Sequence, residues 1–323
     1  MVIEEPRIAG PGSDGSVERR LSPPVSIGYA QARPSIYVAL GDSYSSGEGA
    51  VRRNEPMEER FYAGTDVDGN RCHRSPDAYP AVLARRINSE GGSITFDPTR
   101  HFRACSGAVF DDLYLPNGEN RNELPQLAAL DGIGADVRLV TFSMGGNDAH
   151  FSLVVQACLF GALVPKLDAP CALLGPVVAF AIADLVHKTA GAIFDVRTRA
   201  TRAKIVVVGY PDSVPLLRCV RTGPMGLSEF VFLKGYLAGI NAAIRAGVET
   251  ARALGAGDVV FADTTSQAMR DHHICAREGW VWGVFAYDGW RLGLPPQPKN
   301  AVYSFHPNEP GQSDMAATVL GVI

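Results

Sequence analysis

Short apolar, strand-like runs alternate along this chain with longer segments that show helical periodicity. Such runs, bounded by glycine or polar residues, are typical of buried strands, and they cover residues 36–40, 102–104, 137–142, 205–208 and 259–262. Amphipathic helices are predicted in the gaps, most clearly over Tyr79–Ile87 and Phe230–Leu254. Alternating strands and helices favour a mostly parallel, five-stranded sheet that helices cover on both faces.

Length and composition favour one domain behind a short leader. The chain has 323 residues, which is enough for one large α/β domain. Residues 1–33 are rich in Pro, Gly, Ser and charge, so we expect a flexible leader, with the domain occupying 34–323. Residues 147–201 are long and apolar for a connection. We therefore expect a helical insertion around 150–200 that either lines the substrate site or supplies core helices.

Charge and hydropathy exclude several classes of protein. The net charge is -4 and Lys and Arg form no cluster, so the chain lacks the electrostatic signature of a nucleic-acid-binding protein. The stretch nearest to a membrane span, 171–186, contains Gly175, Pro176 and Asp184. We expect a soluble monomer without stable membrane insertion.

The six cysteines bear on the cellular compartment. They are even in number, widely spaced and without a C-x-x-C pair, which argues against a zinc or thioredoxin-like site. Three disulfides would indicate an oxidising compartment and a secreted protein, whereas free thiols would fit a cytoplasmic one. Residues 1–33 show no signal-peptide pattern, so the two signals point in opposite directions.

The run at 36–40 ends in a glycine-rich segment that carries a candidate nucleophile. Gly41, Asp42 and Ser43 follow it directly, and ligands bind outside the carboxyl ends of the strands in open α/β sheets. Glycine lets the backbone turn sharply there, so Ser43 is placed to attack a substrate. The alternative is a strand-to-helix turn in which Ser43 only caps the helix.

Three further blocks follow strand-like runs or precede the last helix: Gly107, Gly145-Gly146-Asn147-Asp148 and His306. With Gly41-Asp42-Ser43 they occur in the order of the SGNH hydrolases, also called the GDSL esterase/lipase family. The chain resembles this family from about Ser35 to its C-terminus. The resemblance implies a three-layer α/β/α (flavodoxin-like) fold. It also implies a serine esterase or lipase that acts on small-molecule or lipidic esters without a cofactor or metal.

The resemblance implies a role for each matching residue. Ser43 would attack the ester carbonyl, and His306 would serve as general base and then as general acid. The backbone N–H groups of Ser43 and Gly107 and the side-chain amide of Asn147 would hold the oxyanion. Asp42 and Asp148 are expected to be structural, bonding loop amides around the site.

One position departs from the family's pattern. Most members have an aspartate three residues before the histidine, where this chain has Tyr303. The chain is similar here to an actinomycete secreted subgroup with a Ser–His dyad, in which a backbone carbonyl near the histidine, here that of Tyr303 or Ser304, orients the imidazole. Asp271 or Asp314 is the alternative partner. The same subgroup implies three disulfides, Cys72–Cys105, Cys158–Cys171 and Cys219–Cys275.

Several rival interpretations accompany this one. Ser143 lies in a near match to the G-x-S-x-G nucleophile elbow, which lacks the first glycine. His272 and His273 beside Cys275 suggest a metal, but no fourth ligand has sensible spacing, so we expect no metal site. The same acyl-enzyme would serve an acyltransferase if an alcohol or amine replaced water. The fold could also be a catalytically silent ligand-binding module.

Overall fold

The computed structural model describes residues 35–51, 61–118, 120, 123–161, 170–216, 219, 221, 223–284 and 303–323. All of them belong to one compact unit, which spans Pro34–Ile323. The predicted leader, residues 1–33, lies outside the described residues.

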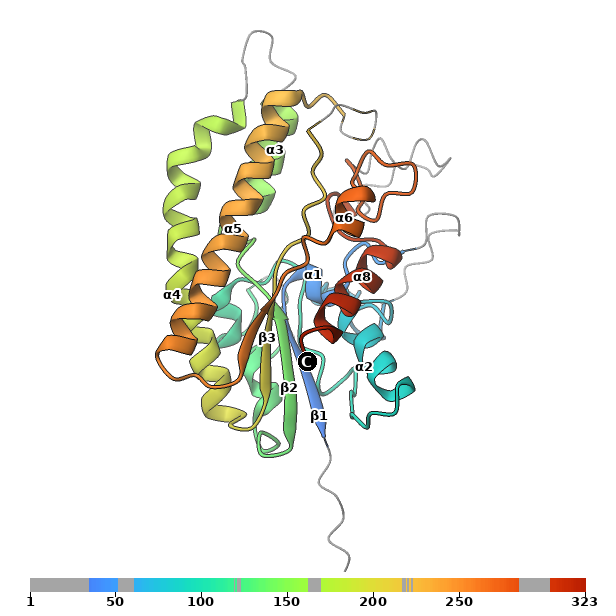
Figure 1. Ribbon diagram of the computed structural model, residues 1–323, viewed down its shortest axis with the longest axis vertical. Helices are drawn as coiled ribbons and strands as arrows, with labels where there is room; N and C mark the ends of the chain where they lie inside the picture. The colour runs from blue at the N-terminus through green and yellow to red at the C-terminus, as the bar shows by residue number, and fades with distance from the viewer. Residues whose placement is uncertain are drawn as a thin grey trace, which may run out of the picture. The chain divides into compact units, whose positions relative to one another are not determined.

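A parallel sheet forms the centre of this unit (Figure 1). Its strands are β1 (Ile36–Gly41), β2 (Val137–Ser143), β3 (Lys204–Val208) and β4 (Val259–Ala262), and they lie in the order β1-β2-β3-β4. The interiors of β1, β2 and β3 are almost fully buried, whereas the two middle residues of β4 are half-buried. Helices cover both faces of the sheet, so these strands are apolar without alternation. The prediction of an α/β fold with a parallel sheet is confirmed, and all four strands direct their carboxyl ends to one edge.

The predicted fifth strand at 102–104 is wrong in the part of the chain that the structure describes, where the sheet has four strands. Phe102 forms only an isolated bridge to Ala39. The segment still runs beside β1, because Arg103 N donates to the Ala39 carbonyl and Cys105 N donates to that of Gly41. Three residues give too short a ladder for a regular strand.

Helices cover the sheet on its two faces (Figure 1), with α4 and α5 packed together on one side and α2 and α8 on the other. The insertion expected around 150–200 comprises α3, η3 and α4. The α-helices are α1 (Ser43–Ser46), α2 (Tyr79–Ser89), α3 (Phe151–Gly161), α4 (Gly175–Arg199), α5 (Leu227–Ala253), α6 (Gln267–Asp271) and α8 (Glu309–Leu320). The 3-10 helices are η1 (Phe110–Leu113), η2 (Gln126–Leu130) and η3 (Pro170–Leu174).

Local sequence explains how the flanking helices begin. Pro80 stands in the first turn of α2, where a missing N–H costs nothing. The side chain of Asn308 caps α8 by accepting a bond from Gly311 N. Because Asn308 follows His306 by two residues, this cap also fixes the backbone next to the candidate general base.

Two helices among the described residues, α4 together with η3 and α5, are long and apolar enough to cross a membrane by length and composition alone. Each also contributes to the core. Leu185 and Ile193 of α4 and Ile240 and Ile244 of α5 are fully buried. Both helices therefore pack part of their length into the hydrophobic core.

Three disulfides join the cysteines with the pairing that the resemblance implies: Cys72–Cys105, Cys158–Cys171 and Cys219–Cys275. The first ties the loop before α2 to the segment beside β1. The second joins α3 to η3. The third joins Cys219, which lies between β3 and α5, to Cys275, which follows α6.

Candidate active site

The backbone at the end of β1 turns sharply and presents Ser43 as the first residue of α1. Gly41 has φ of 123°, and a Cβ there would lie 2.5 Å from the Ser143 carbonyl oxygen, so only glycine fits. The Gln126 side chain holds this turn from both sides, accepting from Gly41 N and donating to its carbonyl. Asp42 caps α1 by accepting from Tyr44 N at 3.0 Å.

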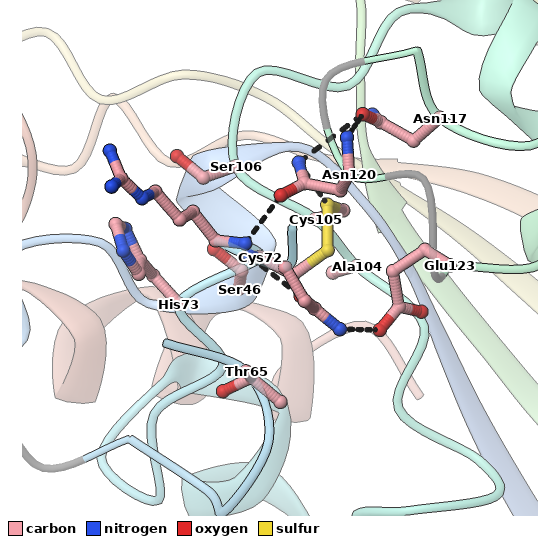
Figure 2. The surroundings of a disulfide bond; sticks show 12 residues. Ser46, Thr65, Cys72, His73, Ala104, Cys105, Ser106, Asn117, Asn120 and Glu123 are labelled. Atoms are coloured by element: carbon pink, nitrogen blue, oxygen red, sulfur yellow. Dashed lines mark hydrogen bonds between the residues drawn. A yellow bond between two sulfur atoms is a disulfide. The ribbon is translucent and has the colours of Figure 1, made fainter. Parts of the chain in front are cut away.

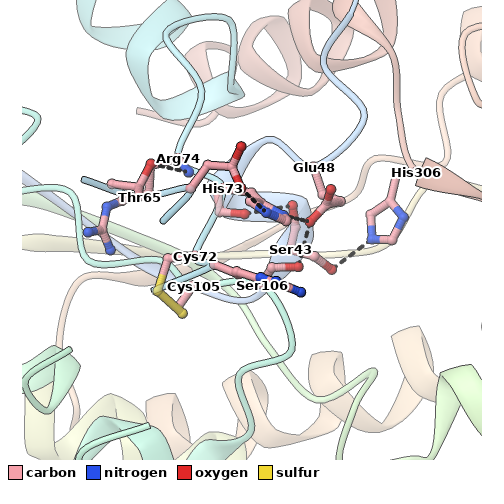
Figure 3. A network of polar contacts seen from close by, with 12 residues as sticks. Ser43, Glu48, Thr65, Cys72, His73, Arg74, Cys105, Ser106 and His306 are labelled. Carbon is pink, nitrogen blue, oxygen red and sulfur yellow. Dashed lines mark hydrogen bonds and ion pairs between the residues drawn. A yellow bond between two sulfur atoms is a disulfide. The ribbon is translucent and has the colours of Figure 1, made fainter. Parts of the chain in front are cut away.

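The loop before α8 brings His306 to Ser43. The imidazole Nε2 lies 2.8 Å from Ser43 Oγ (Figure 3), and Nδ1 lies 3.1 Å from the carbonyl oxygen of Ser304. The carbonyl of Tyr303, the other candidate for orienting the imidazole, instead accepts a hydrogen bond from the backbone N–H of His306 at 2.9 Å. The backbone of Phe305, between Ser304 and His306, is in the left-handed region with φ of 65°. Its carbonyl accepts a hydrogen bond from the Tyr44 hydroxyl.

The three candidate oxyanion donors line the same cavity as this pair, which has a volume of about 900 Å³. The N–H groups of Ser43 and Gly107 donate to no other group in the described part of the chain. Gly107 has φ of 80°, which suits glycine. Asn147 donates one amide hydrogen to the Ala108 carbonyl at 2.9 Å, and this bond orients its amide while the second hydrogen stays available.

A buried network beneath the nucleophile connects three strand ends. Asp42 accepts bonds from the hydroxyls of Ser143 and Tyr210, and Tyr210 also accepts from Gly146 N at 2.8 Å. Burial raises the pKa of Asp42 to about 6, although these bonds lower it. Ser143 is fully buried and bonded to Ser45 as well, whereas Ser43 lines the cavity. The rival nucleophile is therefore shielded from substrate.

Asp148 joins the oxyanion region to the insertion. Its carboxylate accepts from Phe110 N at 3.1 Å and from Lys188 Nζ of α4 at 2.8 Å. The ammonium group of Lys188 and the N–H of Phe110 offset the cost of burying this carboxylate, which fits the structural role expected for Asp148.

Sequence reasoning missed a second polar cluster beside the nucleophile. Glu48 is fully buried, and its Oε2 accepts from Ser106 Oγ at 2.6 Å and contacts His73 Nδ1 at 2.7 Å (Figure 3). Glu48 N also donates to the Ser43 carbonyl at 3.0 Å. Since Ser106 precedes Gly107, Glu48 links the nucleophile turn to an oxyanion donor.

The Cys72–Cys105 disulfide holds both ends of this cluster, as Figure 2 shows. Cys72 precedes His73, and Cys105 precedes Ser106. Ser106 N also donates to the Cys72 carbonyl at 3.1 Å. The signal available in the sequence was Glu48 within the glycine-rich block, but its partners lie 25 and 58 residues away.

The remaining candidates lie elsewhere. His272 stacks on Trp280, and His273 accepts from Cys275 N. No group of three or more candidate metal ligands occurs within the described ranges. Asp314 accepts from Ser266, and Asp271 accepts from Gln267.

Known proteins resemble this chain over most of its length. The model of the GDSL-like Lipase/Acylhydrolase family matches residues 39–313. Lipase 2 of Streptomyces coelicolor is 29% identical over 303 residues, covering 91% of this chain and 88% of that protein. A lipase of Streptomyces rimosus is 29% identical over 292 residues, covering 88% and 85%.

Two solved structures share the fold. An extracellular lipase from Streptomyces rimosus superposes with a TM-score of 0.64 at 24% identity, covering 90% of this chain and 100% of that one. Phospholipase A1 from Streptomyces albidoflavus NA297 gives 0.62 at 26% identity, with the same coverage.

The parallel α/β fold and these similarities define the class as a carboxylic ester hydrolase. The chain belongs to the GDSL-like Lipase/Acylhydrolase family, because the family's model matches well over half of its residues.

Proposed function

We propose that this enzyme hydrolyses esters through a covalent acyl-enzyme formed on Ser43, with His306 as the general base and acid. The observation that carries the proposal is the 2.8 Å contact between Ser43 Oγ and His306 Nε2 on the wall of the cavity. Hydrogen-bonded serine and histidine side chains are the arrangement that activates a hydroxyl for acyl transfer.

In the first half of the reaction, Ser43 Oγ bonds to the ester carbonyl carbon while its proton moves to His306 Nε2. The carbonyl oxygen gains the negative charge, and the N–H groups of Ser43 and Gly107 and the Asn147 amide stabilise it. His306 then gives the proton to the leaving alkoxide, and the carbon–oxygen bond breaks. In the second half, water replaces the alcohol and the same steps return free Ser43 and a carboxylic acid.

The Ser304 carbonyl orients His306 in this proposal. As an acceptor it fixes the tautomer with hydrogen on Nδ1, which leaves Nε2 free to take the serine proton. A neutral carbonyl stabilises the imidazolium less than a carboxylate does. The pair therefore operates as the dyad that the sequence resemblance implies.

The cavity walls favour a lipidic ester. Phe61, Phe151 and Tyr303 line the cavity together with the polar side chains of Asp66 and His73. Aromatic walls suit an acyl chain, and polar side chains suit the alcohol end of such an ester. The names of the relatives, lipase and phospholipase A1, agree with this inference.

Three disulfides and an extracellular relative support secretion as the location.

A matched pair of serine variants tests the proposal. Ser43→Ala should abolish hydrolysis of p-nitrophenyl butyrate, whereas Ser143→Ala should keep most of it, because Ser143 is buried beneath the site. Both variants are assayed for release of nitrophenol after their folding has been verified by circular dichroism. The opposite pattern would assign the nucleophile to Ser143.

A further inference from the structure

The helices α4 and α5 are much longer than the strands β3 and β4 that they cover. α4 has 25 residues and α5 has 27, while β3 and β4 have 5 and 4. At 1.5 Å per helical residue and 3.3 Å per strand residue, the helices are about 40 Å long and the strands about 15 Å. Both helices start at the carboxyl edge, so their N-terminal halves extend beyond the sheet there (Figure 1).

Residues 175–183 of α4, together with α3 and η3, form a surface that we call the apolar overhang. Residues 151–161 and 170–183 contain no Asp, Glu, Lys, Arg or His. Leu173, Val177 and Phe180 are spaced to lie on one helical face, and they are 72%, 54% and 81% exposed. Monomeric soluble proteins rarely leave a contiguous apolar patch of this kind, so its exposure points to a binding partner.

The overhang continues directly from the wall of the catalytic cavity. Phe151 and Ser152, the first residues of α3, line the cavity, and the next residue, Leu153, is half exposed. The Cys158–Cys171 disulfide ties the far end of α3 to η3, so the surface is held in one piece. A partner bound there therefore lies beside residues that line the catalytic cavity.

The chemistry of the overhang selects the partner. A surface without charge offers nothing to an acidic or basic macromolecule, but it gains free energy by leaving water for a low-polarity phase. α4 stays packed against the sheet, because Leu185, Ile193 and Val196 are buried in the core. The helix can therefore lie on a lipid surface but not cross a membrane without unfolding.

We propose that the apolar overhang docks the enzyme onto the surface of an aggregated, uncharged or zwitterionic ester lipid, so that the cavity opens onto the substrate phase. This inference rests on the proposed esterase function, since it names the physical state of the substrate. Monomeric esters in solution need no such contact. Docking therefore changes turnover of aggregated lipid and leaves turnover of a soluble ester unaltered.

The test compares Val177→Gln/Phe180→Gln with wild type and with Leu254→Gln. Glutamine keeps good helix propensity, and Leu254 is a 69% exposed leucine at the opposite end of α5. We expect the double variant to bind phosphatidylcholine vesicles at least about tenfold more weakly in co-sedimentation and to lose a similar factor on a tributyrin emulsion. Hydrolysis of p-nitrophenyl acetate should stay within about twofold for all three proteins.

Three results would overturn the docking proposal. One is wild-type protein that hydrolyses the soluble ester but does not sediment with vesicles. Another is equal vesicle binding by wild type and the double variant. The third is a wild-type dimer in light scattering that the double variant abolishes, which would assign the overhang to a second copy of the chain. Wild-type protein that binds vesicles but does not hydrolyse the soluble ester would instead contradict the proposed function alone.

Discussion

Asn147 tests the oxyanion proposal at the residue scale, because the hydrogen bond from its side-chain amide to the Ala108 carbonyl orients that amide in the cavity. We expect Asn147→Ala to lower kcat by ~10²–10³ with a small change in KM, because the lost donor acts mainly on the developing oxyanion. Stopped assays on p-nitrophenyl butyrate measure both constants. Asn88→Ala, which removes an exposed amide bonded to Ile94, is the control. A rise in KM with kcat unchanged would instead assign Asn147 to substrate binding.

Glu48 gives a second prediction at this scale, through the protonation of His73. Burial lowers the pKa of His73, but the hydrogen bond and charge of Glu48 and the charge of Asp66 outweigh it, so the pKa is raised overall. The unfolded chain releases this proton near pH 6.5. The stabilisation is therefore complete below that pH and is lost as the pH rises through the higher folded value.

Glu48→Gln should remove this pH-dependent contribution. We expect the variant to lose more unfolding free energy relative to wild type at pH 6 than at pH 9, as measured by urea titration. Glu249→Gln, at an exposed position on α5, should show a small, constant difference. An equal loss for Glu48→Gln at both pH values would mean that the pair contributes no linked proton.

At the scale of elements, we expect removal of either of two disulfides to lower the stability of the fold, but only one removal to lower kcat. Loop-closure entropy predicts that replacing both cysteines by alanine costs about 4 kcal/mol for Cys72–Cys105 and about 3 kcal/mol for Cys158–Cys171, whose separations are 33 and 13 residues. Only the first should also lower kcat, because Cys105 directly precedes Ser106 and Gly107. Urea unfolding and kcat on a soluble ester test this. A kcat loss in the Cys158–Cys171 variant alone would reverse the assignment.

The elements also show what a sequence can predict here. All four strands were predicted within one residue of their bounds, because a strand buried on both faces is a continuous apolar run. The run at 102–104 is only three residues long and contains Arg103, and it forms a single isolated bridge with β1. Order along the chain located Ser43 and His306. The Glu48 cluster escaped notice because a disulfide, rather than periodicity, brings its members together.

At the scale of the whole molecule, we expect the cavity to set a preference for acyl length. If Phe61, Phe151 and Tyr303 accept the chain, kcat/KM should rise by about two- to fourfold for each added methylene and then fall once the cavity is full. A series of p-nitrophenyl esters from acetate to decanoate, each below its aggregation concentration, measures this. Highest kcat/KM on acetate would contradict an acyl-binding role for these walls.

The account depends most directly on a covalent intermediate at one residue. Rapid acid quenching during turnover of p-nitrophenyl butyrate, followed by peptide mass spectrometry, should find a butyryl group on the peptide that contains Ser43. The same experiment on Ser43→Ala should find no acylated peptide. A butyryl group on Ser143 or Ser106, or an acylated Ser43→Ala protein, would contradict the mechanism.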